Sequence, residues 1–122
     1  MDRNELWVQA EELADMILQT PEIQRYQQAE ARLQEHPQAQ SLMRRLRSLH
    51  EQIKEFTVRK VPEAYYRHLT QESEAVLQEL EQIPVVREFQ QAQSAVNDLL
   101  QAVTERLGQA VQERMTDTSD SP

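Results

Sequence analysis

The sequence predicts an all-α protein, and three observations support this prediction. Its 122 residues include a single glycine, too few for the tight turns that a sheet protein of this length requires. The composition is dominated by Gln, Glu, Ala, Leu and Arg, which are good helix formers. Apolar residues also recur at helical spacing, in segments that proline separates. We therefore expect a helical bundle.

The N-terminal part of the chain predicts two helices. Residues 4–19 carry a broad apolar stripe at helical period. Thr20 followed by proline is typical of an N-cap and a first helical residue, so a second helix is expected over residues 21–35. We expect Trp7 and Tyr26 to lie in the core rather than in a binding site.

The middle of the chain predicts an antiparallel helical hairpin. The third helix is expected from Pro37 to about Thr57 or Arg59, and the fourth follows Pro62 and ends near Ile83. Each carries an apolar seam with the alternating three-and-four spacing of heptad packing, and a short turn joins them. The third-helix seam is Ala39, Leu42, Leu46, Leu49, Ile53 and Phe56. The fourth-helix seam is Tyr66, Leu69, Ser73, Val76, Leu80 and Ile83.

The two hairpin helices differ in charge. Residues 37–60 sum to +4 and residues 61–83 to −4, so antiparallel packing would place opposite charges face to face. The basic residues include a candidate patch, Arg44, Arg45, Arg47 and Lys54. Two interpretations stay open: the patch binds RNA or an acidic partner, or its charges pair with the acidic fourth helix. The net charge of −8 argues against non-specific binding of nucleic acid by the whole surface.

A long C-terminal helix is expected from Pro84 to about Met115. We expect residues 1–115 to form a single domain and the polar residues 116–122 to form a disordered tail. The apolar stripe of this helix is longer than the other four helices can cover, so part of it should meet another subunit. The candidate interface residues are Phe89, Val96, Leu99, Leu100, Val103 and Leu107.

Two stretches resemble the YlbF/YmcA family of small helical regulators. They are ELEQIPVVREFQQAQSAVNDLLQAV, residues 79–103, and AEELADMILQTPEIQRYQQAEARLQEHPQAQSLM, residues 10–43. The resemblance extends over roughly residues 5–115 and is strongest to the YmcA branch. The most specific part is the IPV and EF segment followed by VNDLL.

The resemblance implies a cytoplasmic protein of Gram-positive bacteria that acts without catalysis. YmcA-like proteins join YlbF-like and YaaT-like partners in one complex. That complex is thought to direct the endoribonuclease RNase Y to certain transcripts, with effects on biofilm formation, competence and sporulation. The partners expected from the resemblance are therefore the chain itself, a YlbF-like chain, a YaaT-like chain and, indirectly, RNase Y.

No cofactor is expected. Relatives in the family can carry cysteines, and the assembled complex has been associated with iron–sulfur clusters. The present sequence contains no cysteine, so it offers neither a disulfide nor a thiolate ligand. The three histidines, His36, His50 and His68, do not belong to a recognised metal-binding motif.

An enzyme is not expected either, and two other classes of function compete with a regulatory subunit. Acidic side chains at helical spacing are typical of a solvated face, and no glycine-rich phosphate loop is present. The first competing class is a nucleic-acid-binding protein that uses the basic third helix. The second is a coiled-coil scaffold that holds unfolded chains.

The expected location is the cytoplasm. The N-terminal residues MDRNELWVQAEELADM include neither the basic region nor the apolar region of a signal peptide. No run of about 18 apolar residues is present, so we expect no insertion into a membrane.

Overall fold

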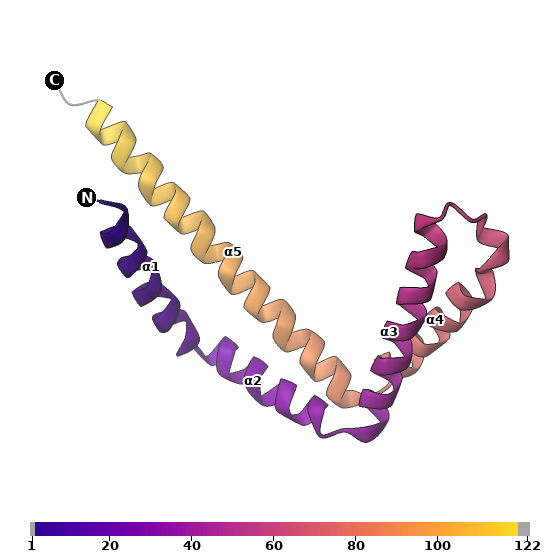
Figure 1. Cartoon of the computed structure of the whole chain (residues 1–122). Coiled ribbons are helices and arrows are strands. Elements are labelled where there is room, and N and C mark those ends of the chain that lie inside the picture. The colour runs from indigo at the N-terminus through magenta and orange to yellow at the C-terminus, as the bar shows by residue number, and fades with distance from the viewer. Residues whose placement is uncertain (1, 120–122) are drawn as a thin grey trace. The chain divides into compact units, whose positions relative to one another are not determined.

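A computed structural model describes residues 2–119, and over this range the fold is all-α, as predicted (Figure 1). It contains five α-helices and one short 3₁₀ helix. The elements in chain order are α1 Arg3–Leu18, α2 Pro21–Gln34, α3 Pro37–Val58, η1 Glu63–Tyr65, α4 Arg67–Glu81 and α5 Pro84–Ser119. Three α-helices, α2, α3 and α5, begin at the prolines that the sequence predicted as their first residues.

The chain groups into two compact units. Residues Gln27–Gln90 form one, which we call the hairpin unit because it contains α3 and α4. The chain before Gln27 and after Gln90 forms the other, which we call the terminal unit. Helices α2 and α5 each contribute to both units. A single domain over residues 1–115 stays a prediction.

Helices α3 and α4 pack against each other as an antiparallel pair, which confirms the predicted hairpin (Figure 1). Their seams supply most of the buried core of the hairpin unit, because heptad spacing keeps one apolar line on the inner side of each helix. The buried residues of this core are Leu33, Ala39, Leu49, Leu69, Val76, Leu80, Ile83 and Val86. Half-buried side chains complete it, including Leu46, Ile53, Phe56, Tyr66 and Phe89.

Polar contacts cross the hairpin as well. The guanidinium of Arg45 donates to the carboxylate of Glu72, which joins the basic and acidic helices as the charge pattern predicted. Ser73 is the buried polar member of the α4 seam, and its hydroxyl shares a 3.1 Å hydrogen bond with Nε2 of His50. This bond satisfies a hydroxyl that burial would otherwise leave without water.

The turn of the hairpin is closed by a C-terminal cap in which Lys60 takes the position usually held by glycine. Lys60 has φ 59°, in the left-handed region. Its amide donates to the carbonyl of Thr57 at 3.1 Å, and the amide of Val61 donates to the carbonyl of Phe56 at 3.0 Å. These two bonds are those of a Schellman motif, so they satisfy carbonyls at the end of α3.

The start of the fourth helix differs from the prediction. A single helix was expected after Pro62, but residues Glu63–Tyr65 form the 3₁₀ helix η1, and α4 begins only at Arg67. Tyr66 separates the two with φ −123° and ψ 16°, outside the α-helical region. Its ring stacks on Phe56 with centroids 5.7 Å apart, so the break between η1 and α4 coincides with an aromatic contact between the two hairpin helices.

Two side chains fix the helix junctions near the N-terminal end of the chain. Nδ1 of His36 accepts a 3.1 Å hydrogen bond from the amide of Ala39, which makes His36 the N-cap of α3. Thr20 stands at the predicted start of α2, and its carbonyl accepts from the amide of Gln24. Its hydroxyl, however, donates to the carbonyl of Ile17 at 2.7 Å, so the side chain satisfies the end of α1.

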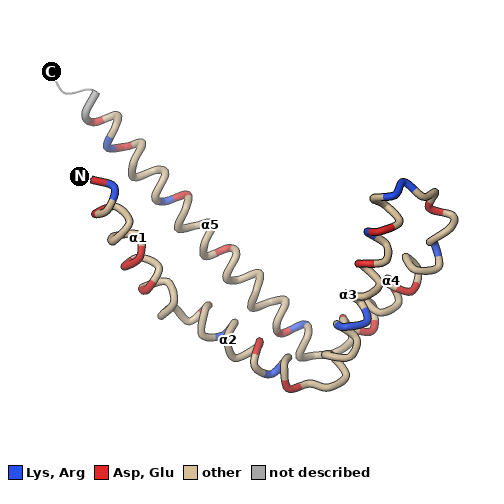
Figure 2. The backbone as a smooth tube through the Cα atoms, in the orientation of Figure 1, with Lys and Arg blue, Asp and Glu red and all other residues tan. Residues whose placement is uncertain are grey.

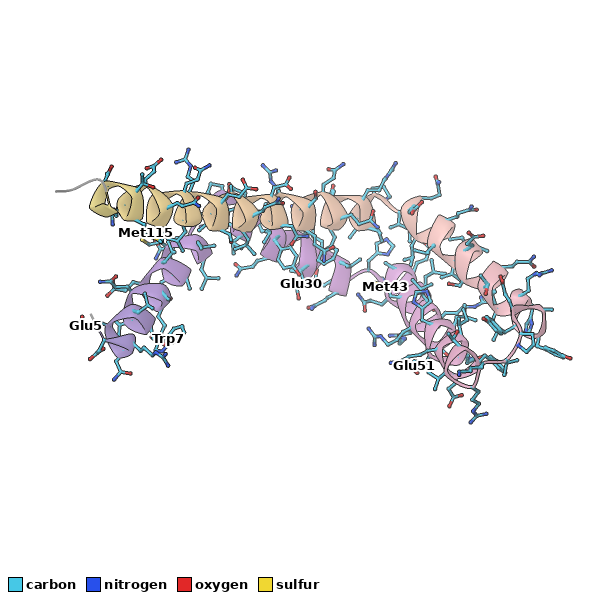
Figure 3. The ribbon with its side chains drawn as sticks, turned by 90° about the horizontal axis from the view of Figure 1, so that it is seen from above. Glu5, Trp7, Glu30, Met43, Glu51 and Met115 are labelled. Carbon is cyan, nitrogen blue, oxygen red and sulfur yellow. The ribbon has the colours of Figure 1, made fainter. Side chains whose placement is uncertain are left out.

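The terminal unit is less buried than the hairpin unit. Helix α1 has no buried residue, and Ala92 is the buried hydrophobic residue of the α5 portion. The prediction that Trp7 lies in the core is wrong, because its side chain is 59% exposed. Tyr26 is half-buried. In Figure 3 the N-terminal half of α1, with Glu5 and Trp7, diverges from α5, which explains why the indole is uncovered.

Helix α5 extends past its expected end. The sequence predicted a helix to about Met115 and a disordered tail over residues 116–122, but α5 continues to Ser119. No helix breaker interrupts residues 116–119, and the hydroxyl of Thr116 donates to the carbonyl of Gln112 within the helix at 2.9 Å. The rest of the predicted tail, residues 120–122, lies outside the described residues.

Candidate protein-interaction surfaces

Large apolar side chains lie exposed along α1 and α5 in the terminal unit. The exposed set on α1 is Leu6, Trp7, Val8, Met16 and Leu18, and the exposed set on α5 is Leu100, Leu107, Val111 and Met115. Single exposed apolar residues are ordinary, but nine on two helices form a surface of the kind that partner proteins cover. We call this set the apolar surface of the terminal unit.

The arrangement of these residues follows from helical geometry. Leu100, Leu107 and Val111 are separated by seven and four residues, so they share one side of α5. On α1, Trp7 and Leu18 are eleven residues apart, close to three full turns, and also share a side. Helix α5 therefore presents a line of apolar side chains, whereas on α1 only Trp7 and Leu18 share a side and the other exposed apolar residues point in other directions.

The six predicted interface residues divide into three groups. Leu100 and Leu107 are 44% and 56% exposed, as an interface requires of the separate chain. Val96, Leu99 and Val103 are half-buried. Phe89 packs against the core of the hairpin unit and serves the fold of the chain itself. Their role in contact with another subunit stays a prediction.

Sequence reasoning missed the contribution of α1. It assigned Trp7 to the core and assigned neither Met16 nor Leu18 to an interface, although all three are exposed. The available signal was the width of the apolar stripe over residues 4–19. It includes more large side chains than one neighbouring helix can cover.

The predicted basic patch lies on α3, where Figure 2 marks its positions in blue, and the packing of the hairpin divides it. Arg45 pairs with Glu72, and this hydrogen bond, with the charge of Glu72, raises the pKa of the guanidinium above its usual value. Arg44, Arg47 and Lys54 are exposed, and none of them forms an ion pair within the described chain. The pairing interpretation therefore holds for Arg45, and binding of RNA or an acidic partner by the other three residues stays a prediction.

The described side chains do not suit a metal or an iron–sulfur cluster. Within residues 2–119 no three His, Asp or Glu side chains lie close enough together to hold a metal ion. An iron–sulfur cluster needs thiolate or imidazole ligands, and cysteine is absent from the whole sequence. Among the described helices, none is long and apolar enough to cross a membrane.

Comparison with known proteins identifies the class first. A family model described as "Control of competence regulator ComK, YlbF/YmcA" matches residues 6–112, which places the chain in a family of regulators. Since the match spans most of the 122 residues, the chain belongs to the YlbF/YmcA family, as the sequence resemblance indicated.

Two relatives come from Bacillus subtilis (strain 168). The YmcA protein is 33% identical over 103 residues, which are 84% of this chain and 71% of YmcA. The regulatory protein YlbF is 26% identical over 122 residues, which are 100% of this chain and 82% of YlbF. The chain is thus similar to both branches of the family over most of their length.

A solved structure shares the fold. It is the crystal structure of Bacillus subtilis RicA in complex with RicF, which aligns with a TM-score of 0.79 and 27% sequence identity. The alignment covers 93% of this chain and 99% of the matched chain. A helical chain of this design is therefore found in a complex with another protein.

Proposed function

We propose that the chain is a non-enzymatic regulatory adaptor of the cytoplasm. It would assemble with itself or with a YlbF-like chain, and with a YaaT-like protein. The assembly would modulate RNase Y-dependent processing of mRNA, and through it biofilm formation, competence and sporulation. Family membership supports the regulatory role, and the family resemblance in the sequence supports the particular pathway.

The observation that carries this proposal is the apolar surface of the terminal unit. Burial of an apolar side chain contributes roughly 25 cal/mol per Å² removed from water. Covering the nine exposed large residues would therefore favour association with a partner. Obligate interfaces resemble such a surface, because they are more apolar than the rest of the protein. Contact with a second helical chain would remove these side chains from water.

The solved relative supports a related chain as one occupant of this surface. RicA was crystallised together with RicF, and the present chain aligns with 99% of the matched chain in that structure. Self-association would use the same helices when a related chain is absent. Both assemblies require that α1 and α5 be covered by a partner.

The proposal is tested by the mass of the purified chain in solution and by the effect of a charge on α5. Leu107→Asp places a carboxylate on the apolar side of α5. Leu107 is 56% exposed and is not part of the buried core. We expect the oligomer to dissociate, since burial of an unpaired charge costs several kcal/mol. An unchanged mass would contradict the proposal.

Gln112→Asp is the matched control. It introduces the same carboxylate on α5, five residues away and on a different side of the helix. We expect this variant to keep the mass of the unchanged chain. Circular dichroism of both variants checks that helix content is retained.

The finer proposal is tested in a cell that contains the partners. A tagged chain recovered at moderate salt should bring a YlbF-like and a YaaT-like chain in a fixed ratio, with RNase Y enriched. Leu107→Asp should lose all three together, and Gln112→Asp should retain them. Recovery of the chain alone, or of the chain with RNA, would contradict the adaptor function.

A further inference from the structure

A groove along α3 combines apolar and basic side chains. It has a volume of about 370 Å³ and is lined by Met43, Leu46, Arg47, His50, Glu51 and Lys54. We call it the basic groove. Arg47, Glu51 and Lys54 follow one another at intervals of four and three residues, so they border the groove along one side of the helix. Figure 3 places Met43 and Glu51 along this helix.

The positive charge of this groove is not neutralised by the neighbouring helix. Arg45, which lies outside the groove, takes the ion pair with Glu72, and Glu79 adds to the acidic field at that side of the hairpin. Arg47 and Lys54 are exposed and form no ion pair among residues 2–119. The only acid that lines the groove is Glu51, so two cations exceed one anion there.

The floor of the groove is apolar. Met43 and Leu46 are half-buried and pack against the core of the hairpin unit. His50, which also lines the groove, reaches across to Ser73 of α4 through a 3.1 Å hydrogen bond. Apolar side chains bordered by cations are complementary to a helix that has leucines on one side and carboxylates beside them.

We propose that the basic groove of the α3–α4 hairpin binds an acidic amphipathic helix of a partner protein. This inference rests on the proposed function, because it supplies the adaptor with a second contact besides the apolar surface of the terminal unit. The apolar floor favours a protein over RNA, since RNA would present phosphates and bases without aliphatic side chains to cover Met43 and Leu46. Single-stranded RNA also prefers to stack on large aromatic rings, and no Phe, Tyr or Trp lines this groove.

The test measures binding of designed probes to the full chain by fluorescence anisotropy. The first probe is an acetylated helical peptide of about 18 residues with Leu on one side and Glu beside it. A second peptide carries Gln in place of each Glu, and a third carries Lys. A single-stranded RNA of about 20 nucleotides completes the set. We expect the Glu peptide to bind, with an affinity that falls as salt rises.

Charge reversal in the groove identifies the site. The double variant Arg47→Glu and Lys54→Glu should weaken binding of the Glu peptide roughly tenfold or more, because both attractions become repulsions. The same variant should gain affinity for the Lys peptide, a result that unfolding cannot produce. The matched control, Arg44→Glu with Arg59→Glu, changes the net charge equally on exposed residues that do not line the groove. It should alter binding less than threefold.

Several outcomes would overturn the inference. Equal binding of the Gln peptide would show that the groove recognises only apolar surface. Binding of RNA that is lost in the Arg47 and Lys54 variant would assign the groove to nucleic acid. Absence of binding by all probes, or equal losses in the two double variants, would also reject it.

The oligomer mass separates this inference from the proposed function. The Arg47 and Lys54 variant should keep the mass of the unchanged chain, because neither residue belongs to the apolar surface of the terminal unit. If Leu107→Asp leaves the mass unchanged while the Glu peptide still binds, the proposed assembly is wrong and the groove stands. If Leu107→Asp dissociates the oligomer while the Glu peptide fails to bind, the proposed assembly stands and the binding role of the groove is wrong.

Discussion

The two units of this chain use their apolar residues in opposite ways. Among the described residues, nine of the ten buried hydrophobic side chains lie in the hairpin unit, and nine of the twelve exposed large ones lie in the terminal unit. Both units are built from helices of similar composition. The difference is that α3 and α4 cover each other's seams, whereas no described residue of α1 is buried. One unit therefore completes its core within the chain, and the other leaves apolar side chains exposed, which the proposed assembly would cover.

The largest expected effect is on the free energy of unfolding, when one leucine in each unit is replaced by alanine. Leu80→Ala should lower the free energy of unfolding by about 2–5 kcal/mol, because Leu80 is 5% exposed and its loss leaves a cavity. Leu18→Ala on α1 should cost less than about 1 kcal/mol in the dissociated chain, since Leu18 is already 54% exposed. Urea unfolding at low protein concentration measures both.

Repeating the Leu18→Ala measurement at high concentration sharpens the comparison. If Leu18→Ala lowers the free energy of unfolding only in the assembled protein, the lost stability belongs to contact between subunits, as expected if α1 lies outside the chain's own core. If Leu18→Ala destabilises the dissociated chain as much as Leu80→Ala does, the contrast between the two units is wrong, because α1 would then be part of the chain's own core.

The next effect concerns the N-cap of α3. His36→Ala removes the acceptor of the 3.1 Å bond from the amide of Ala39, so the free energy of unfolding should fall by about 1 kcal/mol. His36→Asn is the matched control, because asparagine is a good N-cap and its side-chain oxygen can accept the same bond. The urea midpoint distinguishes them, and an equal loss in both variants would show that His36 acts by packing instead.

A stabilising change is expected at the turn of the hairpin. Lys60→Gly removes a Cβ from a backbone with φ 59°, which should raise the free energy of unfolding by up to about 1 kcal/mol. Lys60→Ala keeps the Cβ and should give no such gain, so thermal unfolding of the two variants isolates the backbone contribution. A loss of stability in the glycine variant would mean that the lysine side chain matters more than its backbone.

The smallest expected effect tests whether any other part of the chain packs against α5 at Gly108. Gly108 is exposed, and a Cβ added there would meet no atom within 4 Å. Gly108→Ala should therefore stabilise the helix by about 0.5 kcal/mol through helix propensity alone. Destabilisation that appears only in the oligomer would show that a partner lies against this position.

Much of the hairpin unit was predictable because its signals are local. Heptad spacing identified the seams, and the prolines at 21, 37 and 84 identified three helix starts. The turn was harder, because a lysine adopts the left-handed conformation at residue 60, while the single glycine lies inside α5. Lys60 is held in this conformation by the hydrogen bond from its own amide to Thr57 and by the one from the amide of Val61 to Phe56, and a sequence pattern does not reveal such bonds.

The interaction surfaces were predictable only in part. An apolar stripe marks which side of a helix avoids water, but it does not say whether the same chain or another chain covers that side. This is why Trp7 was assigned to the core and Leu107 to an interface, although both are exposed. The sequence likewise did not show how the basic patch divides. In the structure Arg45 pairs with Glu72, whereas Arg47 and Lys54 form no ion pair among the described residues.

The contiguity of the hairpin has a consequence for biosynthesis. Its polar contacts join residues close in sequence, such as Arg45 and Glu72, 27 positions apart. Pairings of this kind form quickly, because little chain entropy is lost in closing the loop. Translation proceeds from the N-terminus, so α3 and α4 can pair while α5 is still being made. Completion of the chain does not cover the exposed apolar side chains of α1, so under the proposed function these side chains would leave water only when a partner binds.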